Sequence, residues 1–375
     1  MNQSLESPST TSESPSAIFE DWIQLGFNAS CLVIGLPLNL ITLGELINRY
    51  RKTGNRISLL YIHLNLSDLM VIVFYSLTRF CWLLTYQWYG GDALCRLFRF
   101  ADSVSFAISS YVIVCIGLDR TYAMKRPLRA ASGAREHKML WVAWLCAIVV
   151  SLPQFALWQL YEPQSMKDFK QCVSVWIARA DEFNNGVMPP LDLLQFRLYS
   201  IYHILIVFWI PFLLLIISYS MTLRAVVRRH SNGSVLSVDN SRRSFRKSKP
   251  HKKVSTQSVL FMVGHDNSAS NRRHTLCPHD DYEGLRQMSG HARLRKARNR
   301  TMQVSVTLIL IYLCCWLPYN TLSWWRIIDP DSYAIVENTF YFLNGLVVLN
   351  SVFNPLIYGR THLMDFPRRI MRKER

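Results

Sequence analysis

The sequence predicts an all-α membrane protein, a bundle of seven transmembrane helices. Half of the 375 residues are hydrophobic and only 18% are charged, whereas soluble domains average about 25% charged residues. Apolar stretches of about 18 or more residues with few charges indicate membrane spans. The chain has seven such stretches, at residues 22–47, 59–84, 94–123, 139–158, 198–223, 301–325 and 333–358.

The distribution of charge predicts the orientation. The formal charge is +17, and residues 224–300 hold 18 Lys and Arg against five acids, while residues 1–21 hold four acids and no base. Because Lys and Arg concentrate on the cytoplasmic side of membrane proteins, we expect a multi-pass membrane protein with its amino terminus outside and its carboxyl terminus inside. Seven spans, an odd number, agree with this arrangement.

Two terminal segments flank the expected bundle of residues 22–358, and one long loop interrupts it. We expect residues 1–21 to be a disordered extracellular tail and residues 359–375 to be a short cytoplasmic tail with a short amphipathic eighth helix. The third cytoplasmic loop, about 229–298, is rich in Ser, Arg and Lys and poor in apolar clusters, which predicts disorder. Serines that follow arginine pairs in this loop could be phosphorylated. Alternatively, the loop could be a hydrated stretch of basic residues near anionic lipid. The bases flank the spans and form no folded basic module, so nucleic-acid binding is not expected.

Polar residues at mid-span need a polar partner or a functional role. Even on lenient scales, the free energy of inserting a charge at the bilayer centre is unfavourable by about 2.5 to 3.5 kcal/mol. Asp68 lies at mid-span in the second helix. Oxygen donors lie at comparable depth in the first, third and seventh spans, namely Asn39, Ser109, Asn350 and Asn354. Lipid cannot hydrate these groups or the carbonyl freed by Pro355, so we expect the asparagines to face Asp68. The set suits a sodium ion or a proton; a water-filled network without an ion is the alternative.

Two candidate switch elements follow. Asp119 and Arg120 end the third span, where Arg120 can pair with Asp119 in one state and turn toward a partner in another; the alternative is an interfacial pair that merely snorkels. In the sixth span Pro318 removes a backbone hydrogen bond and kinks the helix. Trp316 is expected to form the floor of an outer cavity, although a lone Trp-x-Pro is more often ordinary packing.

The outer half of the bundle carries two further charges. Arg79 lies 11 residues beyond Asp68, about 16 Å nearer the outside, and Asp102 lies two helical turns below Cys95. We expect both to border the outer cavity together with aromatic and amide side chains: Trp82, Trp88, Tyr319, Asn320, Trp324, Trp325, Tyr341, Phe342 and Asn344. Such a cavity suits an aromatic-rich peptide better than an ion.

The same topology indicates which cysteines and which glycosylation sequons lie on the extracellular side. Cys95 and Cys172 are the two cysteines that it places together in an oxidising compartment. Asn2 is the expected glycosylation site, because Asn28 falls within the first helix, too close to lipid, and Asn299 faces the cytoplasm.

These residues together resemble the rhodopsin-like (class A) G-protein-coupled receptors. The matching positions cover all seven spans in order: Asn39, Leu66, Ser67, Asp68, Leu69, Cys95, Asp119, Arg120, Thr121, Trp144, Pro211, Tyr219, Cys315, Trp316, Leu317, Pro318, Asn354, Pro355 and Tyr358. Short strings, among them QWYGGDALC at 87–95 and LDRTYAMKRPL at 118–128, resemble the gonadotropin-releasing hormone and adipokinetic hormone receptor family. Vasopressin-type receptors share several of them.

The resemblance implies a plasma-membrane receptor, not an enzyme, for a short amidated neuropeptide, with a disulfide between Cys95 and Cys172. It implies a heterotrimeric G protein as partner, of the Gq class, with phospholipase C and calcium release. Arg120, Tyr219 and Tyr358 would rearrange as the sixth helix moves outward, and Leu128 would enter the G protein. Arrestin and kinases acting on the Ser-rich third loop are further expected partners, and no cofactor beyond an allosteric sodium ion at Asp68 is expected.

Two positions depart from the family pattern. Thr121 replaces the common Tyr. Vertebrate gonadotropin-releasing hormone receptors typically carry an acid where Arg79 stands and a base where Asp102 stands, so the signs are reversed here. We hypothesise that Arg79 and Asp102 form an exchanged pair.

The nearest rivals are receptors for other ligands. A vasopressin-like peptide is one alternative, and a biogenic amine held through Asp102 is another, although Arg79 would compete for Asp102 and the fifth span lacks a serine cluster. An opsin would need a lysine in the seventh span, and none occurs between Ser332 and Tyr358. A channel gains nothing from the Asp119–Arg120 pair, and no metal-spaced His cluster, phosphate loop or nucleophile triad supports an enzyme.

Overall fold

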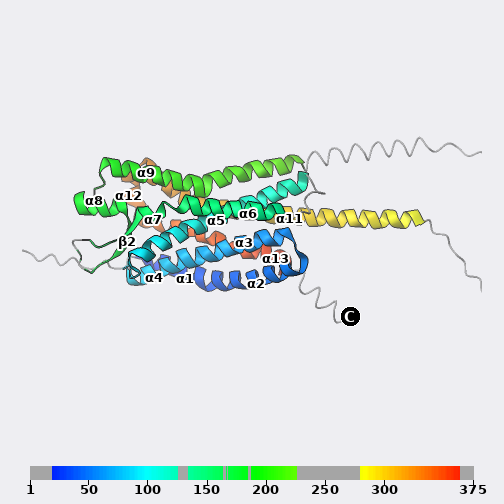
Figure 1. Cartoon of the computed structure of the whole chain (residues 1–375), viewed down its shortest axis with the longest axis horizontal. Coiled ribbons are helices and arrows are strands. Elements are labelled where there is room, and N and C mark those ends of the chain that lie inside the picture. The colour runs from blue at the N-terminus through cyan, green and yellow to red at the C-terminus, as the bar shows by residue number, and fades with distance from the viewer. Residues whose placement is uncertain are drawn as a thin grey trace, which may run out of the picture. The chain divides into compact units, whose positions relative to one another are not determined.

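The computed structural model describes residues 19–125, 134–163, 166, 168–184, 187–225 and 279–363. Within these ranges seven helices are long and apolar enough to cross a membrane: Phe19–Thr53, Arg56–Thr85, Gly91–Lys125, Arg135–Leu157, Pro190–Ala225, Met302–Ile328 and Phe342–Gly359. The chain forms two compact units, one of Met1–Thr222 with Gln303–Arg375, which contains the helical bundle, and one of Leu223–Met302. The predicted seven-helix membrane protein is confirmed (Figure 1).

Each of the first two spans is a helix with a π-helical turn in its course. The first consists of α1 (Phe19–Ser30), η1 (Cys31–Gly35) and α2 (Leu36–Thr53), and the second of α3 (Arg56–Val71), η2 (Ile72–Leu77) and α4 (Thr78–Thr85). Gly54 ends α2 in the left-handed region at φ 58°, which glycine adopts without steric cost. Asn55 then caps α3, its side chain accepting a hydrogen bond from the backbone N–H of Ile57 at 3.1 Å. This two-residue connection makes the two spans antiparallel neighbours.

The third and fourth spans lead into a β-hairpin. The third is α5 (Gly91–Lys125), and the fourth is α6 (Ala134–Ser151) with α7 (Gln154–Leu157). Strands β1 (Trp158–Tyr161) and β2 (Gln171–Ser174) pair antiparallel, with Leu160 opposite Cys172, and a helix α8 (Val175–Asn184) follows.

Two of the last three spans, the fifth and the seventh, also contain a segment that is not regular α-helix. The fifth consists of α9 (Pro190–Ile204), the π-helical η4 (Leu205–Trp209) and helix through residue 225. The sixth lies in α11 (His279–Ile328), with Pro318 inside it. The seventh follows α12 (Pro330–Phe340) and consists of a 3₁₀ segment η5 (Tyr341–Val348) and α13 (Leu349–Leu363).

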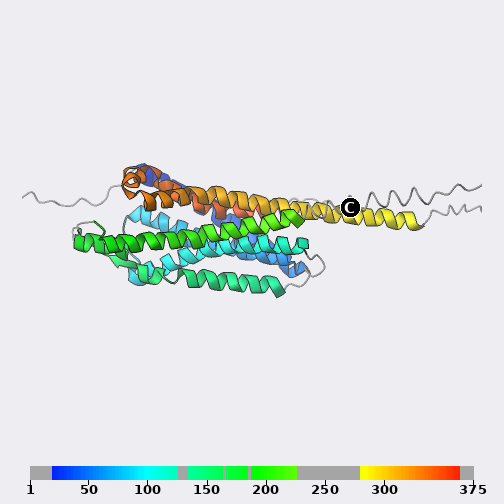
Figure 2. The same cartoon turned by 90° about the horizontal axis from the view of Figure 1, so that it is seen from above.

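Helix α5 is the centre of the bundle. In its most apolar stretch 78% of residues are buried, against 28% in the first, fourth and fifth spans, so α5 is surrounded while the others face outward on one side. Its residues Ile108 and Val112 are fully buried in the core with Leu60, Leu64 and Tyr358. Figure 2, turned by 90°, shows the same bundle with its helices running along one direction.

The structure corrects several predicted boundaries. Besides the helices, the described residues contain the short hairpin β1–β2, which the sequence analysis did not predict. The first helix begins at Phe19 inside the expected tail of residues 1–21, and the fifth begins at Pro190. Residues 279–298, expected to be disordered, lie in α11; this stretch is dense in strong helix formers such as Leu, Arg, Gln, Met and Ala. The rest of the third loop, Asn2, Leu128 and the eighth helix beyond residue 363 lie outside the described residues.

Candidate functional site

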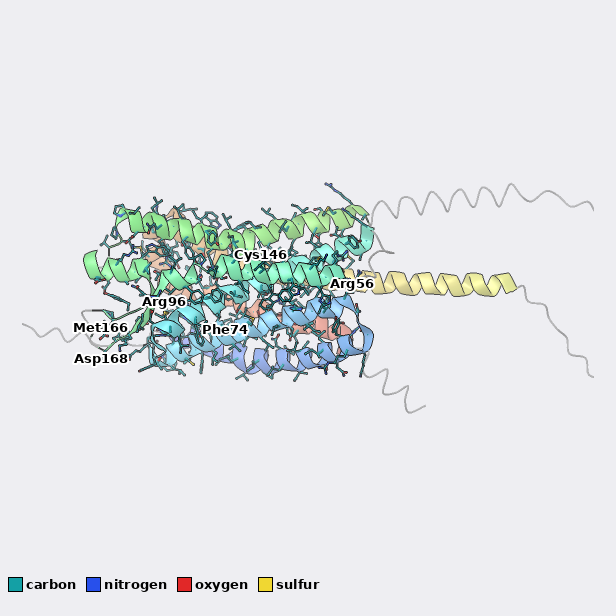
Figure 3. The ribbon with its side chains drawn as sticks, viewed as in Figure 1. Arg56, Phe74, Arg96, Cys146, Met166 and Asp168 are labelled. Carbon is teal, nitrogen blue, oxygen red and sulfur yellow. A yellow bond between two sulfur atoms is a disulfide. The ribbon has the colours of Figure 1, made fainter. Side chains whose placement is uncertain are left out.

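The bundle has two chemically distinct ends. We call the end that holds the Cys95–Cys172 disulfide the disulfide end and the end that holds Arg120 the arginine end. Helix α5 connects them, since it starts at Gly91 and ends at Lys125. Figure 3 shows the two ends, with Arg96 labelled near the first and Arg56 near the second.

The disulfide anchors the hairpin to the bundle. Cys95 and Cys172 are bonded, with their Cα atoms 5.6 Å apart, and they join positions 77 residues apart in the chain. Cys95 lies in the first turns of α5 and Cys172 in β2, so β2 is fixed over the start of the central helix. The predicted disulfide is confirmed.

A small cavity lies beneath this hairpin. Its volume is about 40 Å³, enough for a water molecule or a small chemical group but far below the roughly 300 Å³ at which whole-ligand pockets begin. It brings together four predicted residues, Arg79, Trp82, Trp88 and Asp102. It also contains Cys172 and residues that the sequence analysis missed: Phe74, Tyr75, Thr78, Phe98 and Arg99.

The charged groups of the cavity are held by different neighbours. Arg79 donates from Nη2 to Gln24 Oε1 at 3.1 Å, and its guanidinium carbon lies 4.5 Å from the centroid of the Trp82 ring. Arg99 stacks in the same way on Trp158, at 4.3 Å. Asp102 Oδ1 is buried without a hydrogen-bond partner. Arg79 and Asp102 therefore share one cavity, and their direct pairing remains a prediction.

The other predicted ligand residues do not line this cavity. Asn320 is buried and donates from Nδ2 to the Trp316 carbonyl at 2.9 Å, and its Oδ1 has no hydrogen-bond partner. Trp325 donates from Nε1 to Ser332 Oγ at 3.2 Å and packs edge-on against Tyr333. The remaining members lie on the sixth and seventh spans: Tyr319, Trp324, Tyr341, Phe342 and Asn344.

Trp316 lies in an aromatic cluster below the cavity. Its ring contacts Phe106 edge-on at 5.6 Å and stacks with Phe208 at 6.0 Å. Tyr312 and Tyr319, one turn away on either side, complete the cluster. The spacing of 312, 316 and 319 on one helix face was a readable signal for both tyrosines, whereas Phe208 comes from the fifth span and had none.

Of the three mid-span asparagines that were expected to face Asp68, one, Asn354, hydrogen-bonds it. The Asn354 amide donates to both carboxylate oxygens of Asp68, at 3.1 Å each. The hydroxyl groups of Ser351 and Ser109 lie close to this carboxylate, and Ser109 Oγ does not reach hydrogen-bond geometry. Asn350 is buried on the same helix with its Oδ1 unpaired.

A second branch of the network links the first, second and seventh spans. Asn65, which the sequence analysis missed, donates from its amide to Asn39 Oδ1 at 2.8 Å and to the Tyr358 hydroxyl at 2.9 Å. Asn39 in turn donates to the Ser351 carbonyl at 3.1 Å, and Tyr61 stacks on Tyr358 with centroids 5.0 Å apart. Tyr358 is therefore fully enclosed in the bundle in this conformation.

At the arginine end, the predicted contact between Asp119 and Arg120 is present but belongs to a larger cluster. Arg120 Nη2 lies 3.0 Å from Asp119 Oδ2, as an ion contact without hydrogen-bond geometry. Arg135 lies 2.9 Å from Asp119 and 2.7 Å from Glu136, and Arg56 lies 3.6 and 3.7 Å from the same two acids. Both carboxylates are fully buried. We call these five residues the ionic cluster.

Sequence reasoning found only two members of the ionic cluster. Arg56 begins the second span, and Arg135 and Glu136 begin the fourth, so all three stand next to a membrane span where charges are usual. Only the packing of α3 and α6 against α5 brings them to Asp119. Nothing in the sequence distinguishes a buried Glu136 from a solvated one.

Thr121 and Tyr219 connect the arginine end to the fifth span. The Thr121 hydroxyl lies 2.7 Å from Ser218 Oγ, 2.9 Å from Thr222 Oγ1 and 2.8 Å from the Ser218 carbonyl. Tyr219 hydrogen-bonds Ser305 of the sixth span. Thr121, which stands where the family commonly has a tyrosine, thus forms a cluster of hydroxyl groups with the fifth span. A tyrosine side chain would not fit at this position.

Metal chemistry of the transition-metal kind has no support in the described part of the chain, since no group of three His, Cys, Asp or Glu residues converges there. The oxygen donors around Asp68 suit only a hard cation such as sodium.

Comparisons with known proteins cover most of this architecture. The model of the seven-transmembrane receptor (rhodopsin) family matches residues 41–358. The chain is 33% identical to the G-protein coupled receptor daf-38 of Caenorhabditis elegans, over 92% of this chain and 90% of that one. It is 28% identical to cephalotocin receptor 1 of Octopus vulgaris, over 87% and 73% of the two chains. It is 26% identical to the gonadotropin-releasing hormone receptor of Bos mutus grunniens, over 82% and 78%.

Proposed function

Since the chain belongs to the rhodopsin family of seven-transmembrane receptors, the class A G-protein-coupled receptors, which are receptors and not enzymes, we propose that it recognises a short amidated peptide and activates a heterotrimeric G protein. One observation carries the proposal. The same buried helix, α5, lines an aromatic, charged cavity under a disulfide-anchored hairpin at one end and holds a charge-paired arginine at the other.

The disulfide end faces the extracellular side in this proposal. The acidic residues 1–21 precede the first span, and the basic residues 224–300 follow the fifth, which agrees with Lys and Arg on the cytoplasmic side. A plasma-membrane receptor then presents the cavity to a hormone and the ionic cluster to the cell interior.

The character of the cavity favours a peptide. Arg79 and Arg99 contribute two positive charges against the single carboxylate of Asp102, so a ligand group that accepts hydrogen bonds is preferred over a cation. The surrounding rings supply apolar contact for aromatic side chains. A volume of about 40 Å³ admits one such group, while the rest of the peptide would contact the other predicted ligand residues, on the sixth and seventh spans: Tyr319, Asn320, Trp324, Trp325, Tyr341 and Asn344.

The peptide class is that of gonadotropin-releasing hormone and adipokinetic hormone. The strings at 87–95 and 118–128 and the similarity to the receptor of Bos mutus grunniens support it. A vasopressin-like peptide is the second candidate, because the chain is also 26% identical to the vasopressin V1b receptor of Homo sapiens. A biogenic amine held by Asp102 is disfavoured by the two guanidinium groups in the same cavity.

Activation consists of releasing Arg120 from Asp119. In the described conformation the contact is 3.0 Å long and Arg120 is nearly buried, so it cannot meet a partner. An outward movement of the arginine end of α11, hinged at Pro318, would open this end. Tyr219 and Tyr358, now hydrogen-bonded to Ser305 and Asn65, would then change partners, and Leu128 would contact a G protein of the Gq class. Arrestin and kinases would act on the Ser-rich third loop.

A sodium ion at Asp68 would stabilise the resting conformation. The residues fit such an ion, because three buried oxygens near this carboxylate or on the facing helix lack a hydrogen-bond partner: Ser109 Oγ, Asn350 Oδ1 and Asn354 Oδ1. When bound, the ion supplies positive charge that offsets the buried carboxylate.

A calcium-release screen in transfected cells tests the proposal. The cells express the receptor and receive amidated peptides of the two hormone groups and a panel of biogenic amines, with untransfected cells as the control. We expect a response to at least one peptide, abolished by a Gq inhibitor and by Arg120→Ala. A response to an amine with silence across all peptides would refute the ligand class, and a peptide response insensitive to the inhibitor would refute the Gq assignment.

A further inference from the structure

Hydrogen bonds and a ring contact connect the first helix to the hairpin along the wall of the cavity. Gln24 of α1 is buried, 8% exposed, and accepts the bond from Arg79. Arg79 lies over the ring of Trp82, and Trp82 donates from Nε1 to Gln171 Oε1 at 2.9 Å. The Gln171 amide donates to the Tyr86 carbonyl. Two residues of the cavity wall, Arg79 and Trp82, are therefore each held by a glutamine that lies outside the cavity.

A second tie holds the same segment to α1. The Tyr86 hydroxyl donates to Asp21 Oδ2 at 2.6 Å. Burial and the neighbouring carboxylate raise the pKa of Tyr86 to about 12, so the hydroxyl remains a donor throughout the physiological range. The backbone of Tyr86 is in the left-handed region, at φ 53°, which a non-glycine residue adopts only where its surroundings fix it. The end of the second span is thus fixed from both sides.

Such fixation matters for recognition. An arginine side chain has several rotatable bonds, and ordering it when a ligand arrives weakens binding. Gln24 and the Trp82 ring set the plane of the Arg79 guanidinium before any ligand enters. If such a long side chain must instead be immobilised when the ligand binds, the affinity falls about 3- to 10-fold.

We propose that Gln24 and Gln171 are positioning residues for ligand recognition, which makes the amino-terminal helix α1 part of the binding site. The inference rests on the proposed function, because positioning the Arg79 guanidinium affects recognition only if a ligand binds to it. Arg79 carries only donors, so the group it orients toward is an acceptor of the peptide, a carbonyl or a carboxylate. Gln171 acts on the same site through Trp82, and its neighbour Cys172 anchors it.

The first arm of the test uses purified receptor without peptide. Thermal melting is compared for Gln24→Leu, Arg79→Leu and the double variant. If the side chains are in contact, the double variant melts no lower than the worse single variant. Fully additive shifts would overturn the contact and with it the proposal, whatever peptides do.

The second arm measures potency and maximal response with the most potent amidated peptide of the screen. We expect Gln24→Leu and Gln171→Leu to lower potency about 3- to 10-fold with the maximal response unchanged. Gln24→Glu, which keeps an acceptor for Arg79, should restore potency. In an Arg79→Leu background, Gln24→Leu should have no further effect. Ser30→Ala is the control, because its hydroxyl bonds only to Gly26 on the same helix.

The outcomes separate the two proposals. Coupled melting with unchanged potency in Gln24→Leu would overturn the recognition role and leave a purely structural contact. Silence across the whole peptide panel would overturn the proposed ligand class, and the recognition role with it, while the melting result would still report on the contact. A loss of maximal response without a change in potency would also contradict positioning.

Discussion

The ionic cluster gives the sharpest test of how burial changes the energy of a charge pair. Two ion pairs in this chain have the same separation of 2.7 Å, Arg135 with Glu136 and Arg96 with Asp92. The Glu136 side chain is fully buried, whereas that of Asp92 is 49% exposed. We predict that Glu136→Gln destabilises the receptor far more than Asp92→Asn, although both remove one carboxylate charge at equal distance.

The magnitude follows from the surroundings of Glu136. At 2.7 Å and an effective dielectric of 20, the direct attraction is about 6 kcal/mol, and the desolvation of the carboxylate offsets most of it. The substitution, however, leaves three arginines facing only Asp119. Breaking a fully buried pair costs about 3 to 5 kcal/mol. Because the side chains of Arg135 and Arg56 are 28% and 18% exposed, water reduces this cost to about 2 to 3 kcal/mol. For Asp92→Asn we expect about 0.5 kcal/mol.

The assay is thermal unfolding of purified receptor in lipid nanodiscs. Glu136→Gln should lower the midpoint by several degrees, and Asp92→Asn should stay close to the unaltered chain. The double variant Arg135→Met with Glu136→Leu removes one charge of each sign and should recover part of the loss. Equal shifts for the two single variants, or a double variant less stable than Glu136→Gln, would refute the reasoning.

Three further predictions concern other parts of the bundle. Asp68→Asn should abolish any effect of sodium on agonist potency in membranes compared in sodium and potassium buffers, and a persistent effect would exclude this site. Thr121→Val should cost about 1 to 3 kcal/mol in thermal unfolding, because it leaves buried partners such as Ser218 unsatisfied; Thr121→Ser, which keeps the hydroxyl, is the control. Gly35→Leu should cost about 1 to 3 kcal/mol, because even a Cβ there would lie 2.9 Å from Ile72 Cδ1 and 3.1 Å from Val352 Cγ2, which leaves no room for the rest of a leucine side chain; stability equal to that of the unaltered chain would contradict the close packing.

The fold could be predicted from the sequence because the bilayer imposes one dominant constraint. Apolar length alone located the seven spans, and charge asymmetry gave their expected direction. The hairpin β1–β2 could not be found in this way. Its strands are four residues each, too short for a clear alternation of apolar and polar residues. Residues 279–298 were misread because a high charge density predicts solvation, and it does not exclude a helix.

Part of the candidate site could likewise be predicted from the sequence, and part could not. Asp68 with Asn354, and Asp119 with Arg120, could be paired in advance because a buried charge in a membrane requires a partner. Asn65 and Glu136 could not, since a neutral amide or a charge at a span end is unremarkable until packing encloses it. Gln24 carries no signal of its own, and only its contact with Arg79 gives it meaning.

The most direct measurement of the central claim uses purified receptor in nanodiscs with a purified Gq heterotrimer. Nucleotide exchange on the G protein is followed with and without an amidated peptide that is active in cells. The account predicts that the peptide accelerates exchange and that Asp102→Asn with Arg79→Leu abolishes the acceleration while the receptor remains folded. Unchanged acceleration in that variant would show that the cavity at the disulfide end is not where the peptide acts.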